Sequence, residues 1–260
     1  MTYKTLKIDY ENEIAILTLN RPEKRNAISE EVIKELGEAL DEIDSNRARV
    51  GIMTGAGTTF SAGLDLNYLK EFPSQSPEQI AQDVRRIANL MRRIWSFPQP
   101  LVAAVNGPAI AGGTGIATLC DFTLAAPEAR FGYTEVRIGF IPAIVSTFLV
   151  RQIGEKLARD LLLSGRLIDA EEARTMGLVN EVVSQQQLLP RAREVAANLA
   201  SLSPTALAYT KRLVVKLAAS EIDRELEAAV EMSTRSRSTA DFREGIAAFL
   251  EKRKPVWRGE

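Results

Sequence analysis

The sequence predicts an α/β fold over residues 1–200, followed by a helical region over residues 201–260. In the first part, short apolar segments bounded by turn residues alternate with longer amphipathic segments, a pattern typical of strands that alternate with helices. After about Ile141 the helical spacing predominates, and Pro204 marks the junction between the two parts. With 260 residues, 45% of them hydrophobic and 26% charged, the chain is long enough for one or two globular domains.

Three strands and two helices stand out in the α/β part. Ile14–Leu19 is apolar on both faces, as expected of a strand that is buried on both sides. Ser29 is placed to cap the helix that follows, and Val50–Thr54 predicts the second strand. Pro77 stands at the start of a long amphipathic helix, and Leu101–Val105 predicts the third strand.

The later part of the chain predicts further helices. Asp169 and Glu172 have the spacing of a reciprocal helix cap. Beyond Pro204, three amphipathic helices are expected in succession. Their apolar stripes are Leu207, Thr210, Val214 and Leu217; Ile222, Leu226, Ala229 and Val230; and Phe242, Ile246, Phe249 and Leu250. Such helices could cap the core or pack on another subunit, and the pattern leaves both readings open.

The residue counts exclude several kinds of active site. The chain has no histidine, which excludes Ser-His-Asp and Cys-His arrangements and zinc sites built on imidazole. Cys120 is the single cysteine, so neither an intramolecular disulfide nor a four-cysteine metal site can form. No metal site is expected, and acid–base chemistry must come from carboxylate, lysine, tyrosine or cysteine side chains.

Charge and hydropathy limit the partners. With 33 Lys and Arg against 34 Asp and Glu, the net charge of −1 argues against a nucleic-acid surface. The longest uncharged stretch lies between Arg93 and Asp121, and its three prolines and four glycines favour a strand, turn and helix over a membrane span. The segment after Met1 does not resemble a signal peptide. We therefore expect no membrane partner and a cytoplasmic protein.

Two glycine-rich loops follow predicted strands. Gly55-Ala56-Gly57 lacks the third glycine of a dinucleotide-binding motif, because Phe60 stands at that position. Phe60–Asp65 and Ala111–Gly113 could each offer a backbone N–H to one oxygen atom, which would make an oxyanion hole. The alternative is that these glycines only permit tight turns and close packing.

Several motifs are similar, in order and spacing, to those of one known family. They are Asn20-Arg21-Pro22, Arg25–Ile28, Phe60–Asp65, Pro100–Gly113, Cys120-Asp121, Ala129–Glu135 and Phe249–Trp257. These segments resemble the enoyl-CoA hydratase/isomerase (crotonase) superfamily, and the resemblance spans essentially the whole chain. It implies an α/β spiral of strand-strand-helix repeats with a C-terminal helical trimerisation region. It also implies a homotrimer or a dimer of trimers.

The resemblance further implies an enzyme that binds an acyl-CoA thioester and stabilises its enolate, with no cofactor beyond the coenzyme A of the substrate. The oxyanion donors would be the backbone N–H groups of Leu64 and Gly112. Glu135 matches the glutamate that delivers a proton to the carbon next to the thioester. The implied binding residues are Lys24, Arg25 and Ala27 at the nucleotide end, and Ala62, Asp65 and Leu66 along the acyl–pantetheine channel.

The sequence departs from the hydratase pattern at one position. Gly115 stands where the family places a second glutamate, and the neighbouring Thr114 could bind a water but could not act as a strong base. A single Glu135 is sufficient to move a proton between two carbons, so a Δ3-Δ2 enoyl-CoA isomerase is the runner-up to a hydratase. A non-catalytic acyl-CoA-binding homologue is the third reading.

The segment Glu135–Ala143 resembles hydratases of branched, methylglutaconyl-type thioesters, which suggests a role in branched-chain amino acid degradation or fatty acid metabolism. Ala143 and Ile144 replace the usual two glycines and should narrow the acyl pocket. The absence of an aspartate at position 143 argues against the dehalogenase branch.

Overall fold

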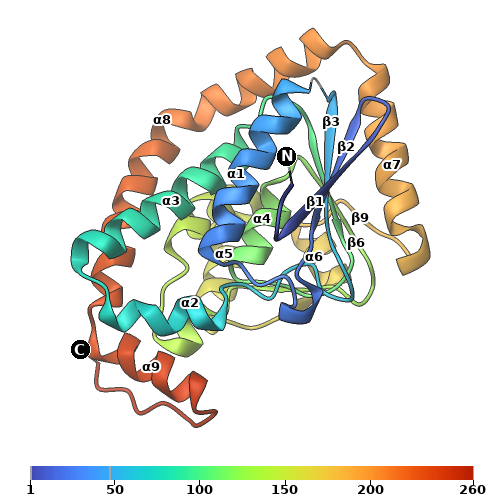
Figure 1. The fold of residues 1–260 in the computed structure, drawn as a ribbon. Coiled ribbons are helices and arrows are strands. Elements are labelled where there is room, and N and C mark those ends of the chain that lie inside the picture. Colours follow the sequence, from blue (N-terminus) through green and yellow to red (C-terminus); the bar gives the residue numbers. More distant parts are fainter. Residues whose placement is uncertain (1, 47, 260) are drawn as a thin grey trace.

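A computed structural model describes residues 2–46 and 48–259, and a six-stranded sheet lies at its centre (Figure 1). In spatial order its strands are β1 (Leu6–Glu11), β2 (Ile14–Leu19), β3 (Val50–Gly55), β4 (Leu101–Val105), β6 (Phe122–Ala125) and β9 (Glu181–Val182). β1 is antiparallel to β2, and the other neighbouring strands are parallel. The three strands predicted from the sequence are confirmed as β2, β3 and β4.

Helices cover both faces of this sheet (Figure 1). The helices are α1 (Glu30–Ser45), α2 (Leu66–Glu71), α3 (Pro77–Trp95), α4 (Gly112–Leu119), α5 (Ala143–Ser164), α6 (Ala170–Met176), α7 (Gln185–Ser201), α8 (Pro204–Arg237) and α9 (Ala240–Leu250). Ile16 and Ile52 belong to a buried cluster with Leu188 of α7, whereas Leu17 and Met53 point into the main core with α1 and α3. Successive residues of a strand thus pack into hydrophobic clusters on opposite faces of the sheet. Because both faces are buried, β2 is apolar along its whole length.

Capping residues fix where the predicted helices begin. The Ser29 side chain accepts a hydrogen bond from the Val32 N–H at the start of α1, as predicted. Asp169 accepts one from the Glu172 N–H at the start of α6. The reciprocal half of that predicted cap does not form, because the Glu172 carboxylate accepts a hydrogen bond from Arg166 instead.

A small second sheet and three short 3₁₀ helices lie nearer the site. The sheet consists of β5 (Ala109–Ile110), β7 (Arg130–Gly132) and β8 (Ile168–Asp169), and the 3₁₀ helices are η1 (Pro22–Lys24), η2 (Phe72–Ser74) and η3 (Glu135–Ile138). β5 is parallel to β7, which is antiparallel to β8. These strands of two or three residues place the loop before α4 beside the loop before η3.

The region after Pro204 contains two helices, not the three that the sequence predicts. The first two predicted stripes belong to the single helix α8, because the residues between Leu217 and Ile222 are Ala, Ala, Ser and Glu, none of which breaks a helix. Ile222 and Leu226 are buried, and α8 packs on α3 and α5. In the first half of α8, by contrast, Leu213 and Leu217 are exposed.

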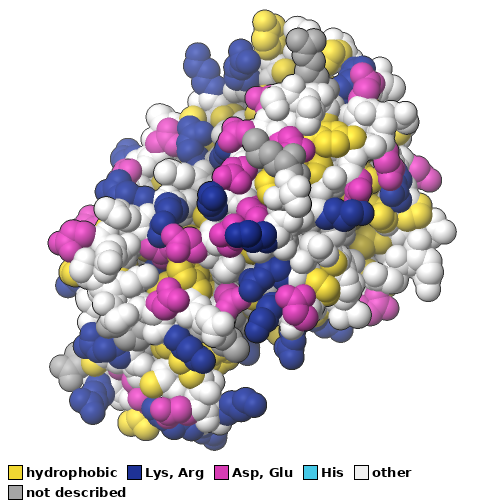
Figure 2. Space-filling model, viewed as in Figure 1, with side chains coloured by type: hydrophobic (Ala, Val, Ile, Leu, Met, Phe, Trp, Pro, Cys, Tyr) yellow, Lys and Arg dark blue, Asp and Glu magenta, His cyan; other side chains and the backbone are white. Residues whose placement is uncertain are grey.

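The visible surface mixes charges of both signs. Figure 2 shows Lys and Arg side chains interspersed with Asp and Glu over this face, in keeping with a net charge of −1. None of the helices in the described ranges is both long and apolar enough to cross a membrane.

Candidate active site

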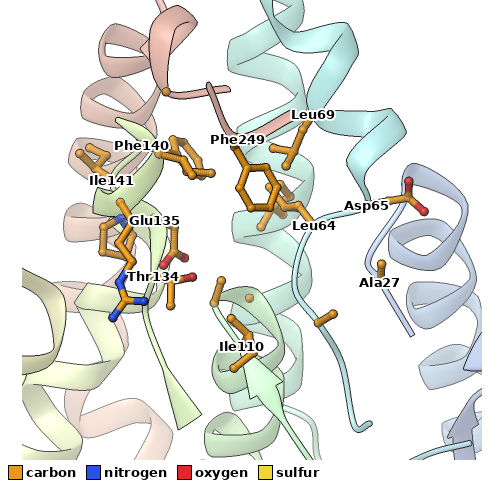
Figure 3. Close-up of a pocket in the computed structure, with 18 of the residues that line it drawn as sticks. Ala27, Leu64, Asp65, Leu69, Ile110, Thr134, Glu135, Phe140, Ile141 and Phe249 are labelled. Atoms are coloured by element: carbon orange, nitrogen blue, oxygen red, sulfur yellow. The ribbon is translucent and has the colours of Figure 1, made fainter. Parts of the chain in front are cut away.

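A cavity of about 770 Å³ opens between the loops that follow β2, β3 and β5, helices α2 and α3, and the C-terminal helices (Figure 3). All but one of the site residues predicted from the sequence line it: Lys24, Arg25, Ala27, Ala62, Leu64, Asp65, Gly112 and Glu135. The exception is Leu66, whose side chain lies outside the described part of the structure. In Figure 3, Glu135 and Thr134 lie on one side of the cavity and Ala27 and Asp65 on the other.

The two glycine-rich loops are in direct contact. The Ile110 N–H donates to the Ser61 carbonyl at 2.9 Å, and Ser61 also forms a bridge with Ala109. A Cβ on Gly63 would lie 3.0 Å from the Ile110 carbonyl oxygen, and the φ of Gly63 is +83°. Position 63 therefore requires glycine, both for its backbone conformation and for the close approach of the second loop.

Each loop presents one backbone N–H without a partner. Around Leu64, the Gly63 carbonyl accepts from the Ile28 N–H and the Asp65 N–H donates to the Ile28 carbonyl, so the Leu64 N–H faces away from Ile28. Gly112 is the first residue of α4, where the N–H has no acceptor within the helix. Among the described residues, neither N–H donates to another protein group. Two free donors on touching loops are what an oxyanion hole requires.

Ala111, the residue before Gly112, has an uncommon backbone. Its φ of 52° is a conformation that residues other than glycine rarely adopt. Its N–H donates to the Gly132 carbonyl, and its carbonyl accepts from the Gly115 N–H. These two hydrogen bonds, one to β7 and one within α4, hold the strained residue and so fix the direction of the next N–H.

Glu135 is the first residue of η3 and is buried, with 8% of its surface exposed. Its Oε2 atom has no hydrogen-bond partner among the described residues. Burial raises the pKa of Glu135 to about 7, although a hydrogen bond from its own backbone N–H acts in the opposite direction. A carboxyl group with such a pKa can both accept and donate a proton near neutral pH.

The surroundings of Glu135 contain no second acid from α4. A Cβ on Gly115 would lie 2.6 Å from Cγ1 of Val145 and 3.7 Å from the sulfur of Met91. Both neighbours line the cavity, so this part of its wall is apolar. The Thr114 hydroxyl is buried and donates to the Ala109 carbonyl at 2.6 Å, while accepting from the Gly132 N–H. Thr114 is fully buried and is not among the residues that line the cavity, so the expectation that it could bind a water at the site is wrong.

The opposite end of the cavity carries charged side chains. Lys24 and Arg25 are exposed at its edge. Asp65 pairs with Arg21 at 2.9 Å, and its other oxygen accepts from the Asn67 N–H at the start of α2. Its carboxylate points away from Glu135 in Figure 3. Asp65 therefore lines the cavity with both carboxylate oxygens held by the protein.

The C-terminal helices contribute cavity residues that the sequence interpretation did not assign to the site. Phe249 of α9 lies beside Leu64 in Figure 3, and Ser233 and Arg237 of α8 also line the cavity. For Phe249, the apolar stripe of the last helix was the available signal. For Ser233 and Arg237 no local pattern pointed to the site.

The matches to known proteins agree with this geometry. The family model described as Enoyl-CoA hydratase/isomerase matches residues 9–260. The chain is a member of this family.

Individual relatives cover nearly all of the chain. A Thermus thermophilus protein named "Putative enoyl-CoA hydratase" is 42% identical over 243 residues, covering 93% of this chain and 96% of that protein. A crotonyl-CoA hydratase of Syntrophomonas wolfei is 32% identical over 257 residues, or 98% of each chain. The crystal structure of an enoyl-CoA hydratase/isomerase from Pseudoalteromonas atlantica aligns with a TM-score of 0.88 at 32% identity, covering 98% of this chain and 100% of that one.

The mixed α/β architecture is thus that of the crotonase superfamily, and the protein is an enzyme of the hydratase/isomerase family. Membership does not distinguish hydration from isomerisation. Within the described ranges, no group of three or more Asp, Glu or Cys side chains could hold a metal ion. The reaction must be argued from the cavity itself.

Proposed function

We propose that the enzyme adds water to the C2=C3 double bond of an α,β-unsaturated acyl-CoA thioester. The observation that carries the proposal is Glu135, a buried carboxyl group with an unpartnered oxygen and a pKa of about 7, in the cavity that Leu64 and Gly112 also line. The similarity to a crotonyl-CoA hydratase supports hydration as the reaction type.

One carboxylate is sufficient because the proton that it takes from water is the proton that it returns. Glu135 accepts a proton from water while the water oxygen bonds to C3, and the electrons of the C2=C3 bond move to the thioester oxygen. The N–H groups of Leu64 and Gly112 stabilise the negative charge of this enolate. The protonated Glu135 then delivers its proton to C2, which gives the 3-hydroxyacyl-CoA and restores the carboxylate.

The positively charged side chains at the edge of the cavity support coenzyme A as the thiol that carries the acyl group of the substrate. Lys24, Arg25 and Ala27 would hold the nucleotide end, where the two cations would bind its phosphates. Ala62, Asp65 and Leu66 would line the acyl–pantetheine channel. A pantetheine thioester lacks these phosphates. Replacing Lys24 and Arg25 by alanine should therefore raise the KM for the CoA thioester and leave the KM for the pantetheine thioester unchanged.

One observation favours isomerisation as a second candidate. Val145 and Met91, the neighbours of Gly115, form an apolar part of the cavity wall. Helix α4 therefore supplies no second carboxylate that could orient a water molecule. An isomerase needs only one group that removes a proton from C2 and delivers one to C4. Glu135 would perform both steps.

Product mass separates the candidates. The enzyme is offered crotonyl-CoA, a branched 2-enoyl-CoA and a 3-enoyl-CoA, with Glu135→Gln as the matched control. Hydration adds the mass of one water, whereas isomerisation changes the position of the double bond at constant mass. Isomerisation without hydration would contradict the proposal. Binding of acetoacetyl-CoA without any turnover would identify a non-catalytic acyl-CoA-binding homologue.

The proposal includes assembly as a homotrimer or a dimer of trimers in the cytoplasm. Exposed apolar side chains on the first half of α8 support an interface there: Tyr209, Leu213, Val214 and Leu217. Light scattering of the purified protein measures its mass in solution. A monomer at micromolar concentration would contradict the assembly.

A further inference from the structure

The water of the proposed hydration needs more than one group to hold it. A water molecule that attacks C3 donates one hydrogen bond to Glu135 and points a lone pair at the carbon, so its second hydrogen still needs an acceptor. Bound waters in proteins typically make about three hydrogen bonds. The part of the cavity wall next to Gly115 is formed by Val145 and Met91, which are apolar and supply no acceptor. The acceptor must therefore come from another element.

The hydroxyl group of Thr134 is available for such a water. Thr134 directly precedes η3 and lines the cavity, where it is half-buried. A threonine at the start of a helix usually accepts a hydrogen bond from an N–H of the first turn, but the Thr134 side chain makes no such bond. Its oxygen pairs with none of the described residues and yet is not fully enclosed, so it can contact a molecule in the cavity.

The turn that carries Glu135 also fixes the position of Thr134. The Thr134 carbonyl accepts from the Arg137 N–H at 3.0 Å, and the Glu135 carbonyl accepts from the Phe140 N–H at 3.1 Å. Tyr133, the preceding residue, is 1% exposed and anchors the segment in the main core. Consecutive Cα atoms are about 3.8 Å apart, so the two side chains start close together. In Figure 3 both lie on the same side of the cavity, where one water molecule can bind both.

Three other polar side chains of the cavity are less suited to accept from this water. Both carboxylate oxygens of Asp65 are held by the protein, and its carboxylate points away from Glu135 in Figure 3. Arg137 of η3 also lines the cavity, but a guanidinium only donates hydrogen bonds. Ser233 carries the other hydroxyl among the described cavity residues, but it comes from α8, so no shared turn holds it beside Glu135. A threonine hydroxyl can both donate and accept, which suits a bound water.

We propose that the Thr134 hydroxyl binds the water that adds to C3, in the role that a second carboxylate at position 115 would have. This inference rests on the proposed function, since it names a further group for that reaction. The water donates one hydrogen bond to Glu135 and the other to the Thr134 oxygen, which directs a lone pair at C3. The proton still moves from water to Glu135 and then to C2, and Thr134 neither gains nor loses a proton.

Thr134→Val tests the proposal, because valine has nearly the shape of threonine and lacks the hydroxyl. Since that hydroxyl has no partner among the described residues, the variant loses no hydrogen bond of the fold. The kcat for hydration of crotonyl-CoA, or of the branched 2-enoyl-CoA if it is the better substrate, should fall roughly 10- to 100-fold, as expected for a misplaced reactant. The KM should change by less than about twofold. Thr134→Ser restores an acceptor and should keep kcat within about threefold of the native value. Thr175→Val, on the exposed surface of α6, is the matched control and should leave kcat unchanged.

Hydrogen exchange at C2 separates water binding from the acid–base chemistry of Glu135. In D₂O, Glu135 takes a proton from C2 of butyryl-CoA, exchanges it with the solvent and returns a deuteron to the enolate, and no water adds to carbon. Mass spectrometry of the thioester measures the deuterium. Thr134→Val should exchange within about twofold of the native rate, whereas Glu135→Gln should exchange about 100-fold more slowly or less. If Thr134→Val lost hydration and exchange together, Thr134 would act through Glu135 or through the fold, against the proposal.

The same measurements distinguish this proposal from the proposed function. If the native enzyme hydrates the 2-enoyl thioesters and Thr134→Val does so at the native rate, the reaction stands and the role of Thr134 is refuted. Ser233→Ala examines the other hydroxyl of the cavity. If this variant, and not Thr134→Val, lost hydration while keeping exchange, the water would belong to Ser233. If the native enzyme isomerised the 3-enoyl-CoA and hydrated none of the thioesters, the proposed function would fail as well.

Discussion

Two buried glutamates of this enzyme have opposite properties. Glu35 on α1 is 4% exposed and Glu135 is 8% exposed, but Glu135 lies much deeper among protein atoms than Glu35, which is covered only near the surface. Glu35 accepts hydrogen bonds from the Lys4 N–H, the Thr5 N–H and the Thr5 hydroxyl, at 2.5 to 2.8 Å. Burial acts to raise its pKa, but these hydrogen bonds, first among them that of the Thr5 side chain, bring it below the ordinary value. Glu135 has an unpartnered oxygen, and its pKa is raised to about 7.

The difference shows that depth of burial and hydrogen-bond partners together decide whether a carboxylate keeps its charge. Glu35 ties the segment before β1 to α1, and its negative charge is part of that attachment. Glu135 is left without such partners in a cavity, where a proton can be gained or lost. Glu35 is held by the fold, whereas Glu135 has the properties that the proposed acid–base role requires.

The largest effect is expected from Glu135→Gln, which keeps the shape of the side chain and removes proton transfer. The kcat should fall by roughly 10²- to 10⁴-fold on the best substrate. Glu35→Gln is the matched control, because it changes the other buried glutamate and should leave the kcat of the folded enzyme within about twofold of normal. Near-normal turnover by Glu135→Gln would remove Glu135 from the mechanism.

The next effect tests the oxyanion hole proposed at Leu64 and Gly112. Gly112→Pro deletes one N–H donor and should cost on the order of 3 kcal/mol in the activation barrier. Proline fits the first position of a helix, although it restricts the backbone of Ala111 before it. Gly112→Ala keeps the N–H, and its Cβ would meet the ends of two flexible side chains, Cδ1 of Ile28 at 3.3 Å and Cε of Met91 at 3.9 Å. If a folded Gly112→Pro enzyme matched Gly112→Ala in rate, Gly112 would not be a donor.

The pH dependence of the free energy of unfolding should also differ between the two glutamates. Because the pKa of Glu135 rises from 4.5 to about 7 on folding, its stabilising contribution is present below pH 4.5 and is lost as the pH rises through 7. Glu135→Gln removes this loss and should stabilise the protein by up to about 3 kcal/mol above pH 7, with no gain below pH 4.5. Urea unfolding of both proteins at acidic and alkaline pH measures the difference. A gain that is independent of pH would contradict the assigned cause.

The smallest effect is expected at Glu35, with the opposite sign. Glu35→Gln replaces an oxygen acceptor by an amide donor opposite Thr5 and Lys4, which should destabilise the protein by about 1–3 kcal/mol at neutral pH. Since the pKa of Glu35 is lowered in the folded state, this penalty should shrink as the pH falls through that pKa. A constant penalty in urea unfolding down to acidic pH would mean that the charge of Glu35 contributes nothing.

Much of the fold could be predicted because the signals are local. The apolar runs of β2 and β4 and the Ser29 cap each lie within a few neighbouring residues. The second sheet could not be predicted, since β5 and β8 have two residues each and depend on partners brought in by the fold. The sequence predicts two helices where the structure has the single helix α8, of which only the second half is buried within the chain.

The site, like the fold, has features that the sequence predicts and features that only the folded chain shows. Glu135 and the two loops could be predicted from motifs, whose residues keep a fixed spacing. The crowding of Gly115 by Val145 could not, because α4 and α5 meet only in the folded chain. Asp83 and Arg237 form a buried ion pair and are separated by 154 positions, so no local pattern relates them.

The length of α8 also has a consequence for how this enzyme can change over evolution. The helix spans about 50 Å, and ion pairs fasten it to the core along its course: Lys211 with Asp121, Asp223 with Arg92, Glu225 with Arg151, and Arg237 with Asp83. An insertion of one residue would turn everything after it by about 100° and move Arg237 off Asp83. Loops tolerate such insertions, but this helix does not. The residues of α8 that line the cavity, Ser233 and Arg237, can therefore change by substitution, but the length of the helix before them cannot change without breaking these ion pairs.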